Sequence, residues 1–133
     1  MFRKTIYCLI ILFLVACGDK SQKTVQPDLP FIWENATVYF LMTDRFNNGD
    51  TTNDFKHPAG QDPAPYRGFM GGDIKGVTAK IKAGYFDSLG VNAIWTTPVV
   101  ENVDGSVDEG TGRSYGFHGY WTKDWTMIDP RLG

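Results

Sequence analysis

Two short apolar runs in the chain have the character of buried strands. Residues 37–42 combine β-branched and aromatic side chains and place apolar groups on both faces. Such a run is typical of a strand that is buried on both sides of a parallel sheet. Residues 91–95 repeat this pattern and predict a second buried strand.

The stretch between these runs has helical periodicity. Its apolar residues recur at three- and four-residue spacing: Ile74, Val77, Ile81, Tyr85 and Leu89. This spacing predicts one amphipathic helix that begins after Asp73 as its N-cap and ends at Gly90. A strand, a helix and a strand in this order predict a right-handed βαβ unit with parallel strands, and therefore an α/β fold.

Two polar segments without periodicity follow the predicted strands. Residues 44–72 are rich in Asn, Asp, Gly and Pro, and residues 101–114 are rich in Gly and Asp. Long loops of this kind in a domain are often functional. Because ligands bind at the carboxyl ends of parallel strands, we expect both loops to lie on the ligand-binding face of the sheet.

The first loop contains a dense set of side-chain oxygen ligands. Asn48, Asp50, Asn53 and Asp54 lie close together, and Asp73 lies beyond the far end of the loop. Ca²⁺ accepts roughly six to eight oxygen ligands in flexible geometry. The loop is not an EF-hand, because the twelfth position counted from Asn48 is Ala59 instead of Glu. A solvated, turn-rich loop without a metal is the alternative.

The second loop leads to a cluster of aromatic and polar side chains. His118, Tyr120 and Trp121 follow one another closely, and Asp124 and Trp125 come soon after. Aromatic rings stack on the apolar faces of sugars, while His and Asp hydrogen-bond the hydroxyl groups. The segment therefore indicates a sugar site, with a buried aromatic cluster as the alternative.

The N-terminus has the pattern of an export signal. Arg3 and Lys4 precede an apolar run at residues 6–15, which is too short to span a bilayer comfortably as a helix. The Leu-Val-Ala-Cys sequence at 14–17 resembles a bacterial lipobox, in which Cys17 is lipidated and becomes the first mature residue. An ordinary secretory peptide or an uncleaved anchor are the alternatives.

This pattern predicts three parts of the chain. They are a lipoprotein signal peptide at 1–16, a flexible tether at 17–30 and the folded part at 31–133. The expected location is the cell envelope, with the protein anchored to the membrane through the lipid on Cys17. Gly18 replaces the Asp that is associated with inner-membrane retention in some bacteria, which favours the outer membrane or the cell surface.

Charge and cysteine content exclude two classes of function. The chain has 13 basic and 15 acidic residues, and cleavage of the signal removes Arg3 and Lys4 from the basic set. The mature part is therefore acidic, so we expect no nucleic-acid partner. If cleavage occurs before Cys17, Cys8 leaves with the signal and Cys17 carries lipid, so we expect neither to be free for a disulfide or a metal site.

Several blocks of the chain resemble those of the α-amylase family of glycoside hydrolases. They occur in the same order as in that family and cover roughly residues 37–133. The blocks are Val38 to Phe46, Gly71 to Asp73 with Gly76, Leu89 to Trp95, Pro98 to Asn102, and His118 to Trp121. The likeness is greatest to α-amylases and cyclodextrin glucanotransferases.

The resemblance implies a (β/α)8 TIM barrel, of which this chain holds the first two strands, the first helix and part of the next loop. It implies α-linked glucans as substrate, with Tyr120 stacking on the sugar, His118 hydrogen-bonding it and Trp121 packing beneath them. It also implies a Ca²⁺ cofactor. The matching ligand positions are Asn48, Asp50, Asn53, Asp54, the Gly71 carbonyl and Asp73.

The resemblance assigns no catalytic residue in this chain. Family members are retaining enzymes with two catalytic carboxylates about 5 Å apart. These carboxylates lie on later barrel strands, whereas the last residue of the sequence is Gly133. We therefore expect these residues alone to be inactive and poorly folded. A non-catalytic glycan-binding lipoprotein and a disrupted gene product are the alternatives.

Overall fold

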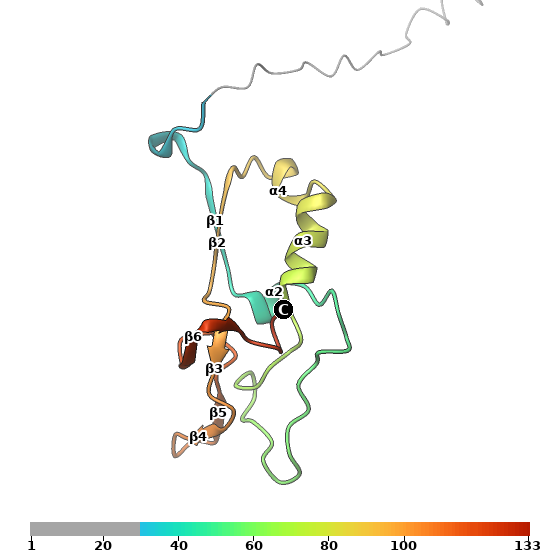
Figure 1. Ribbon diagram of the computed structural model, residues 1–133, viewed down its shortest axis with the longest axis vertical. Coiled ribbons are helices and arrows are strands. Elements are labelled where there is room, and N and C mark those ends of the chain that lie inside the picture. Colours follow the sequence, from blue (N-terminus) through green and yellow to red (C-terminus); the bar gives the residue numbers. More distant parts are fainter. Residues whose placement is uncertain (1–29) are drawn as a thin grey trace, which may run out of the picture. The chain divides into compact units, whose positions relative to one another are not determined.

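The computed structural model describes residues 30–133 (Figure 1). The predicted signal peptide, the lipidated Cys17 and nearly all of the predicted tether lie outside the described residues. Among residues 30–133, no helix has both the length and the apolar character needed to cross a membrane. The elements in chain order are η1 (Trp33–Asn35), β1 (Val38–Leu41), α2 (Thr43–Phe46), α3 (Ile74–Lys82), α4 (Tyr85–Ser88), β2 (Ala93–Thr96), β3 (Val100–Asn102), β4 (Ser106–Asp108), β5 (Arg113–Tyr115) and β6 (Thr122–Ile128).

The predicted strand–helix–strand unit is confirmed. β1 and β2 pair in parallel, with Val38 opposite Ala93 and Leu41 opposite Thr96. The helices α3 and α4 connect them along the chain, as Figure 1 shows. One face of the pair packs on these helices through a core in which Leu41, Val77 and Phe86 are buried. This burial is the hydrophobic contribution that holds the unit together.

The other face of the β1–β2 pair is open in the described residues. Phe40 is 55 % exposed and Trp95 is 64 % exposed, and their rings meet edge to face with centroids 5.9 Å apart. Val38 on the same face is also exposed. The prediction that these strands are buried on both sides is therefore wrong for residues 30–133.

The predicted helix is present but broken. Asp73 caps α3 as expected, because its side chain accepts a hydrogen bond from the Gly76 N–H. The prediction of one continuous helix to Leu89 is wrong, since α3 ends at Lys82 and α4 begins after Gly84. Gly84 has φ +70°, a left-handed conformation that interrupts the helical hydrogen bonds and that glycine adopts at low cost.

The second polar segment is more ordered than its composition predicts. β4 and β5 form an antiparallel pair within it, and β3 pairs with the later strand β6. A second core lies beside these strands and consists of Phe69, Tyr115 and Leu132. Tyr115 and Leu132 are each 1 % exposed, so this core fixes the long loop, the hairpin and residues 131–133 together.

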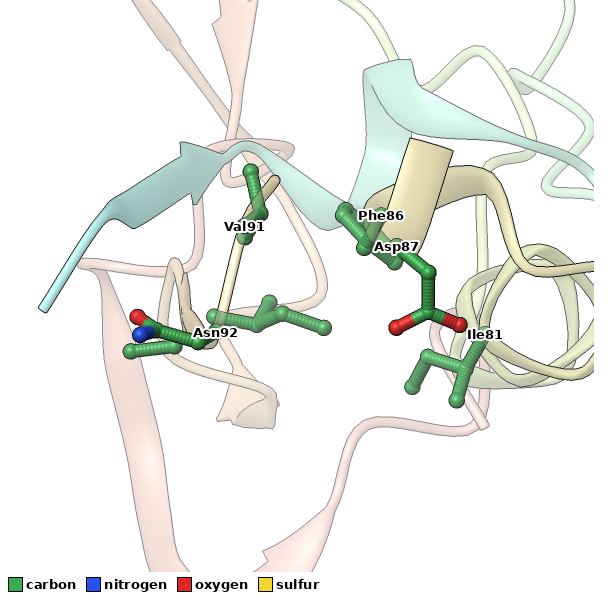
Figure 2. Close-up of a pocket in the computed structure, with 7 residues that line it drawn as sticks. Ile81, Phe86, Asp87, Val91 and Asn92 are labelled. Atoms are coloured by element: carbon green, nitrogen blue, oxygen red, sulfur yellow. The ribbon is translucent and has the colours of Figure 1, made fainter. Parts of the chain in front are cut away.

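A pocket of about 290 Å³ lies between the helices and β2. Figure 2 shows Ile81, Phe86 and Asp87 on its helical side and Val91 and Asn92 on the side that leads into β2. Val91 and Asn92 precede β2, so the pocket lies at the amino end of the strand. Ligands of parallel α/β folds bind at the opposite, carboxyl ends, and the pocket is therefore not the candidate site.

Candidate functional site

The candidate site begins where β1 ends, at a buried carboxylate. The Asp44 side chain is fully buried and accepts hydrogen bonds from the Met70 N–H at 2.9 Å and the Gly71 N–H at 3.3 Å. Burial raises the pKa of Asp44, while these backbone donors and the neighbouring Arg45 guanidinium lower it in opposition. Asp44 therefore closes the long loop by joining its first residues to its last.

The segment that carries His118 rests on residues that follow both parallel strands. The Arg45 guanidinium, just after β1, lies 4.1 Å from the centroid of the Phe117 ring. Gly119 lies directly against the carbonyl of Pro98, just after β2, where a Cβ would clash. Its φ of +87° also requires glycine. The segment therefore lies at the carboxyl ends of both strands, as expected for a ligand-binding loop.

His118 and Tyr120 form a small, rigid platform. The Tyr120 N–H donates a hydrogen bond of 3.0 Å to His118 Nδ1, and the two rings stack with centroids 5.8 Å apart. Because Nδ1 accepts this bond, the proton of the neutral imidazole lies on Nε2. Burial lowers the pKa of His118, and the negative charge of Glu109 raises it in opposition. Tyr120 is 59 % exposed, so its ring face is open to a ligand.

Trp121 packs against the His118 ring of this platform. Its ring meets the His118 ring edge to face, with centroids 4.9 Å apart, and the residue is half-buried. The Trp121 N–H donates to Asn102 Oδ1 at 2.9 Å. The structure thus brings the three predicted sugar-binding residues together, with Tyr120 outermost.

Among the six predicted metal-ligand positions, Asn48, Asp54 and Gly71 lie against one another. Asn48 Nδ2 donates to Asp54 Oδ1 at 2.7 Å, and both side chains lie against Gly71. Gly71 has φ +87°, and a Cβ there would clash with both side chains. Asn53 Oδ1 is buried and has no hydrogen-bond partner. A buried oxygen without a partner is costly unless something satisfies it.

The other two positions have their own partners. Asp50 accepts from the Thr52 hydroxyl and pairs with Lys75 at 3.0 Å, and these hydrogen bonds lower its pKa to about 2. The fully buried Asp73 carboxylate accepts the backbone N–H groups of Gly49, Asp50 and Gly76. Asp73 thereby fastens the start of the loop to the start of α3.

Comparison with known proteins identifies the family of the chain. The family model for the α-amylase catalytic domain matches residues 40–133, more than half of the chain. The chain belongs to the α-amylase family of glycoside hydrolases.

Two members of the family illustrate how similar the chain is to its relatives. A periplasmic α-amylase from Escherichia coli is 45 % identical over 108 residues, which are 78 % of this chain and 16 % of that protein. A cyclomaltodextrin glucanotransferase from Klebsiella oxytoca is 40 % identical over 117 residues, which are 85 % of this chain and 17 % of that protein. The chain thus spans about a sixth of the length of these relatives.

Solved structures of the α-amylase family resemble the described residues. The cyclomaltodextrin glucanotransferase CldA superposes with a TM-score of 0.62 at 35 % identity, covering 74 % of this chain and 20 % of that one. The Geobacillus thermoleovorans α-amylase in complex with acarbose gives 0.56 at 37 % identity, covering 77 % of this chain and 18 % of that one.

The donor set of this family member fits a calcium ion by its chemistry. Residues 30–133 contain no group of three or more His, Cys, Asp and Glu side chains that could hold a metal. Such a group does not include amide and backbone oxygens, which Ca²⁺ also accepts. The unpartnered Asn53 Oδ1 is an amide oxygen of this kind, and the Asp54 side chain near Gly71 adds carboxylate oxygens.

One group of polar residues at this site carries no signal in the sequence pattern. Asn102 and Asp129 are fully buried, and Arg131 pairs with Asp129 at 2.6 Å. Asn102 lies in one of the blocks that resemble the family, but nothing in its local pattern indicates a role. Its contacts reach 19 and 27 residues along the chain, and only the fold shows them.

The lowered pKa of His118 predicts how the platform responds to acid. In the unfolded chain the imidazole has its usual pKa of 6.5, whereas burial lowers it in the folded protein. Neutral His118 therefore stabilises the fold fully above pH 6.5, and this contribution is lost as the pH falls through the folded pKa. Protonation also converts Nδ1 into a donor, which breaks its bond with the Tyr120 N–H.

NMR titration checks this prediction. The imidazole signal that disappears in His118→Asn should titrate below pH 6.5, and the Tyr120 amide shift should change over the same range. Titration of His118 at or above 6.5 in the folded protein would contradict it.

Proposed function

We propose that the chain forms the N-terminal part of the (β/α)8 barrel of a retaining glycoside hydrolase that acts on α-linked glucans. Three observations support the barrel: the parallel β1–β2 pair, its open apolar face with Phe40 and Trp95, and the one-sixth share of the relatives' length. The names of relatives include an α-amylase bound to acarbose, which supports the substrate class.

The observation that carries the proposal is the His118–Tyr120 platform at the carboxyl ends of the strands. The exposed Tyr120 ring stacks on the apolar face of a glucose unit, and His118 Nε2–H donates to one of its hydroxyl groups. Trp121 packs beneath and supports the His118 ring. These residues bind and orient the sugar, and none of them is assigned to bond cleavage.

Calcium serves this site as a structural cofactor in the proposal. Asn53, Asp54 and the Gly71 carbonyl hold the ion, with Asn48 and Asp73 completing the oxygen set; Asp73 retains acceptor capacity beyond its three backbone donors. Asp50 is the sixth position, and its carboxylate must contact both the ion and the Lys75 ammonium group. The bound ion supplies positive charge that links the two ends of the long loop.

We also propose that the chain is exported and anchored to the outer membrane or cell surface through a lipid on Cys17. The lipobox-like sequence at 14–17 supports the anchor. The periplasmic location in the name of the Escherichia coli relative supports a location in the cell envelope.

The function is tested with Tyr120→Ala in the full-length protein that carries this chain. Loss of the stacking ring should weaken maltooligosaccharide binding about tenfold, or about 1.4 kcal/mol. Calorimetry and hydrolysis assays measure the effect. Tyr66→Ala is the matched control, because Tyr66 is also a highly exposed tyrosine but lies on the long loop. Sugar binding without hydrolysis in the wild type would favour the glycan-binding alternative, and no binding would refute the proposal.

The calcium proposal is tested by chelation. Removing Ca²⁺ with EDTA should lower the melting temperature of the protein, and added Ca²⁺ should restore it. Asn53→Ala should abolish the calcium-dependent part of this shift, whereas Asn35→Ala, at an exposed asparagine outside the loop, should preserve it. A melting temperature that does not respond to calcium in the wild type would rule out the site.

The anchor is tested by cell fractionation. Cys17→Ala should move the protein from the membrane fraction to a soluble fraction and abolish labelling with radioactive palmitate. Cys8→Ala is the matched control, since Cys8 lies within the apolar run and would leave with the signal. Unchanged fractionation and labelling of Cys17→Ala would show that the anchor lies elsewhere.

A further inference from the structure

Asn102 is a fully buried amide whose side chain has partners on both sides. Its Oδ1 accepts from the Trp121 N–H at 2.9 Å, and its Nδ2 donates to the Val100 carbonyl at 2.8 Å. Its exposed fraction is 0 %. A buried amide with both ends satisfied has one orientation, because rotating it would place like groups against each other.

The Asn102 side chain accepts the Trp121 N–H in place of a backbone carbonyl. β3 and β6 pair with register shifts on both sides of Glu101, so their ladder is irregular where it approaches the sugar-binding segment. The Trp121 carbonyl still accepts from the Val103 N–H at 2.9 Å, but the Trp121 N–H finds its acceptor in the Asn102 side chain. The amide therefore fixes Trp121, the residue directly after the platform, to β3.

The turn of residues 116–121 presents His118 and Tyr120. Its first residue, Gly116, also lies against Asn102. A Cβ added to Gly116 would lie 3.2 Å from the Asn102 Cβ, so the backbone of Gly116 packs closely on this residue. The Gly116 carbonyl in turn accepts from the Gly119 N–H at 3.0 Å. Both ends of the turn that presents His118 and Tyr120 therefore rest on Asn102.

Asn102 is itself held by a buried ion pair. Its N–H donates to Asp129 Oδ2 at 2.9 Å, and its carbonyl accepts from Arg131 Nη2 at 3.2 Å. The Arg131 guanidinium also lies 4.4 Å from the centroid of the Phe69 ring. All of these partners belong to the protein itself, so the contacts that hold Asn102 and the turn involve no ligand.

We propose that Asn102 is a positioning residue for the glucan subsite, one that fixes the His118–Tyr120 platform through the backbone of Trp121 and Gly116. This proposal rests on the proposed function of the platform. Asn102 is fully buried, so it acts on the sugar only through the geometry of the segment. A preorganised platform binds its ligand without the entropic cost of ordering the loop.

The test compares Asn102→Ala with Asn92→Ala in the full-length protein. Asn92 is a matched control because its Oδ1 also accepts a backbone hydrogen bond across the chain, from the Thr37 N–H at 2.8 Å, but at the amino ends of the strands. For maltooligosaccharide hydrolysis, Asn102→Ala should raise KM about tenfold with kcat changed less than about twofold. Asn92→Ala should leave both constants unchanged. Hydrogen exchange of residues 116–121 should become faster only in Asn102→Ala.

Asn102→Asp separates positioning from general stability and provides a second variant if the alanine protein does not fold. It keeps an oxygen acceptor for the Trp121 N–H but loses the donor to the Val100 carbonyl. We expect a lower melting temperature with KM within about twofold of the wild type. A KM in Asn102→Asp as high as in Asn102→Ala would show that Asn102 is only structural.

The outcomes distinguish the two proposals. A wild-type protein that neither binds nor cleaves maltooligosaccharides refutes the proposed function, and the role of Asn102 with it. An active wild type with unchanged KM in Asn102→Ala, or unchanged exchange of residues 116–121, refutes only the role of Asn102.

Discussion

The buried carboxylate of Asp44 is the constraint on which the site depends. It stands at the end of β1 and receives the Met70 and Gly71 N–H groups from the far end of the long loop. The backbone carbonyl of Asp44 accepts from the Gly72 N–H at 2.8 Å, so the loop returns to its starting point. The adjacent Arg45 pairs with Asp44 and also lies over the Phe117 ring, which brings the aromatic segment to the same place. Arg45 is partly exposed whereas Asp44 is fully buried, so removing Arg45 would leave a buried carboxylate held by backbone donors alone.

The buried acidic side chains around the site have one structural role in common, which is to hold the backbone through hydrogen bonds. Asp44 holds the end of the loop, Asp73 holds its start against α3, and Asp129 holds β3 through the Asn102 N–H. Burial alone raises the pKa of Asp129, but hydrogen bonds from Arg131 and Asn102 outweigh it and lower the pKa. Because these donors stabilise its ionised form, the Asp129 carboxylate is a poor general acid.

The sequence predicted the elements that follow from local pattern and failed where tertiary contacts decide. The strands, the Asp73 cap and the grouping of His118, Tyr120 and Trp121 were predictable, because periodicity and short-range spacing determine them. The break at Gly84 was not, since glycine within a helical pattern reads equally well as a weak helical position. The short strands of the second loop and the role of Asn102 depend on partners distant in sequence, which no local pattern contains.

In the proposed sugar site, the residues that would contact the sugar differ from the residues that hold the turn in place. Tyr120 is exposed and His118 is partly so, and both belong to a turn with glycines at 116 and 119 that is intrinsically flexible. Such a turn would lose affinity to conformational entropy if nothing fixed it. The contacts of Gly119 with Pro98, Phe117 with Arg45 and Trp121 with Asn102 remove that freedom from three directions. Gly119 allows the close approach to Pro98, and together these three contacts within the protein hold the platform in place.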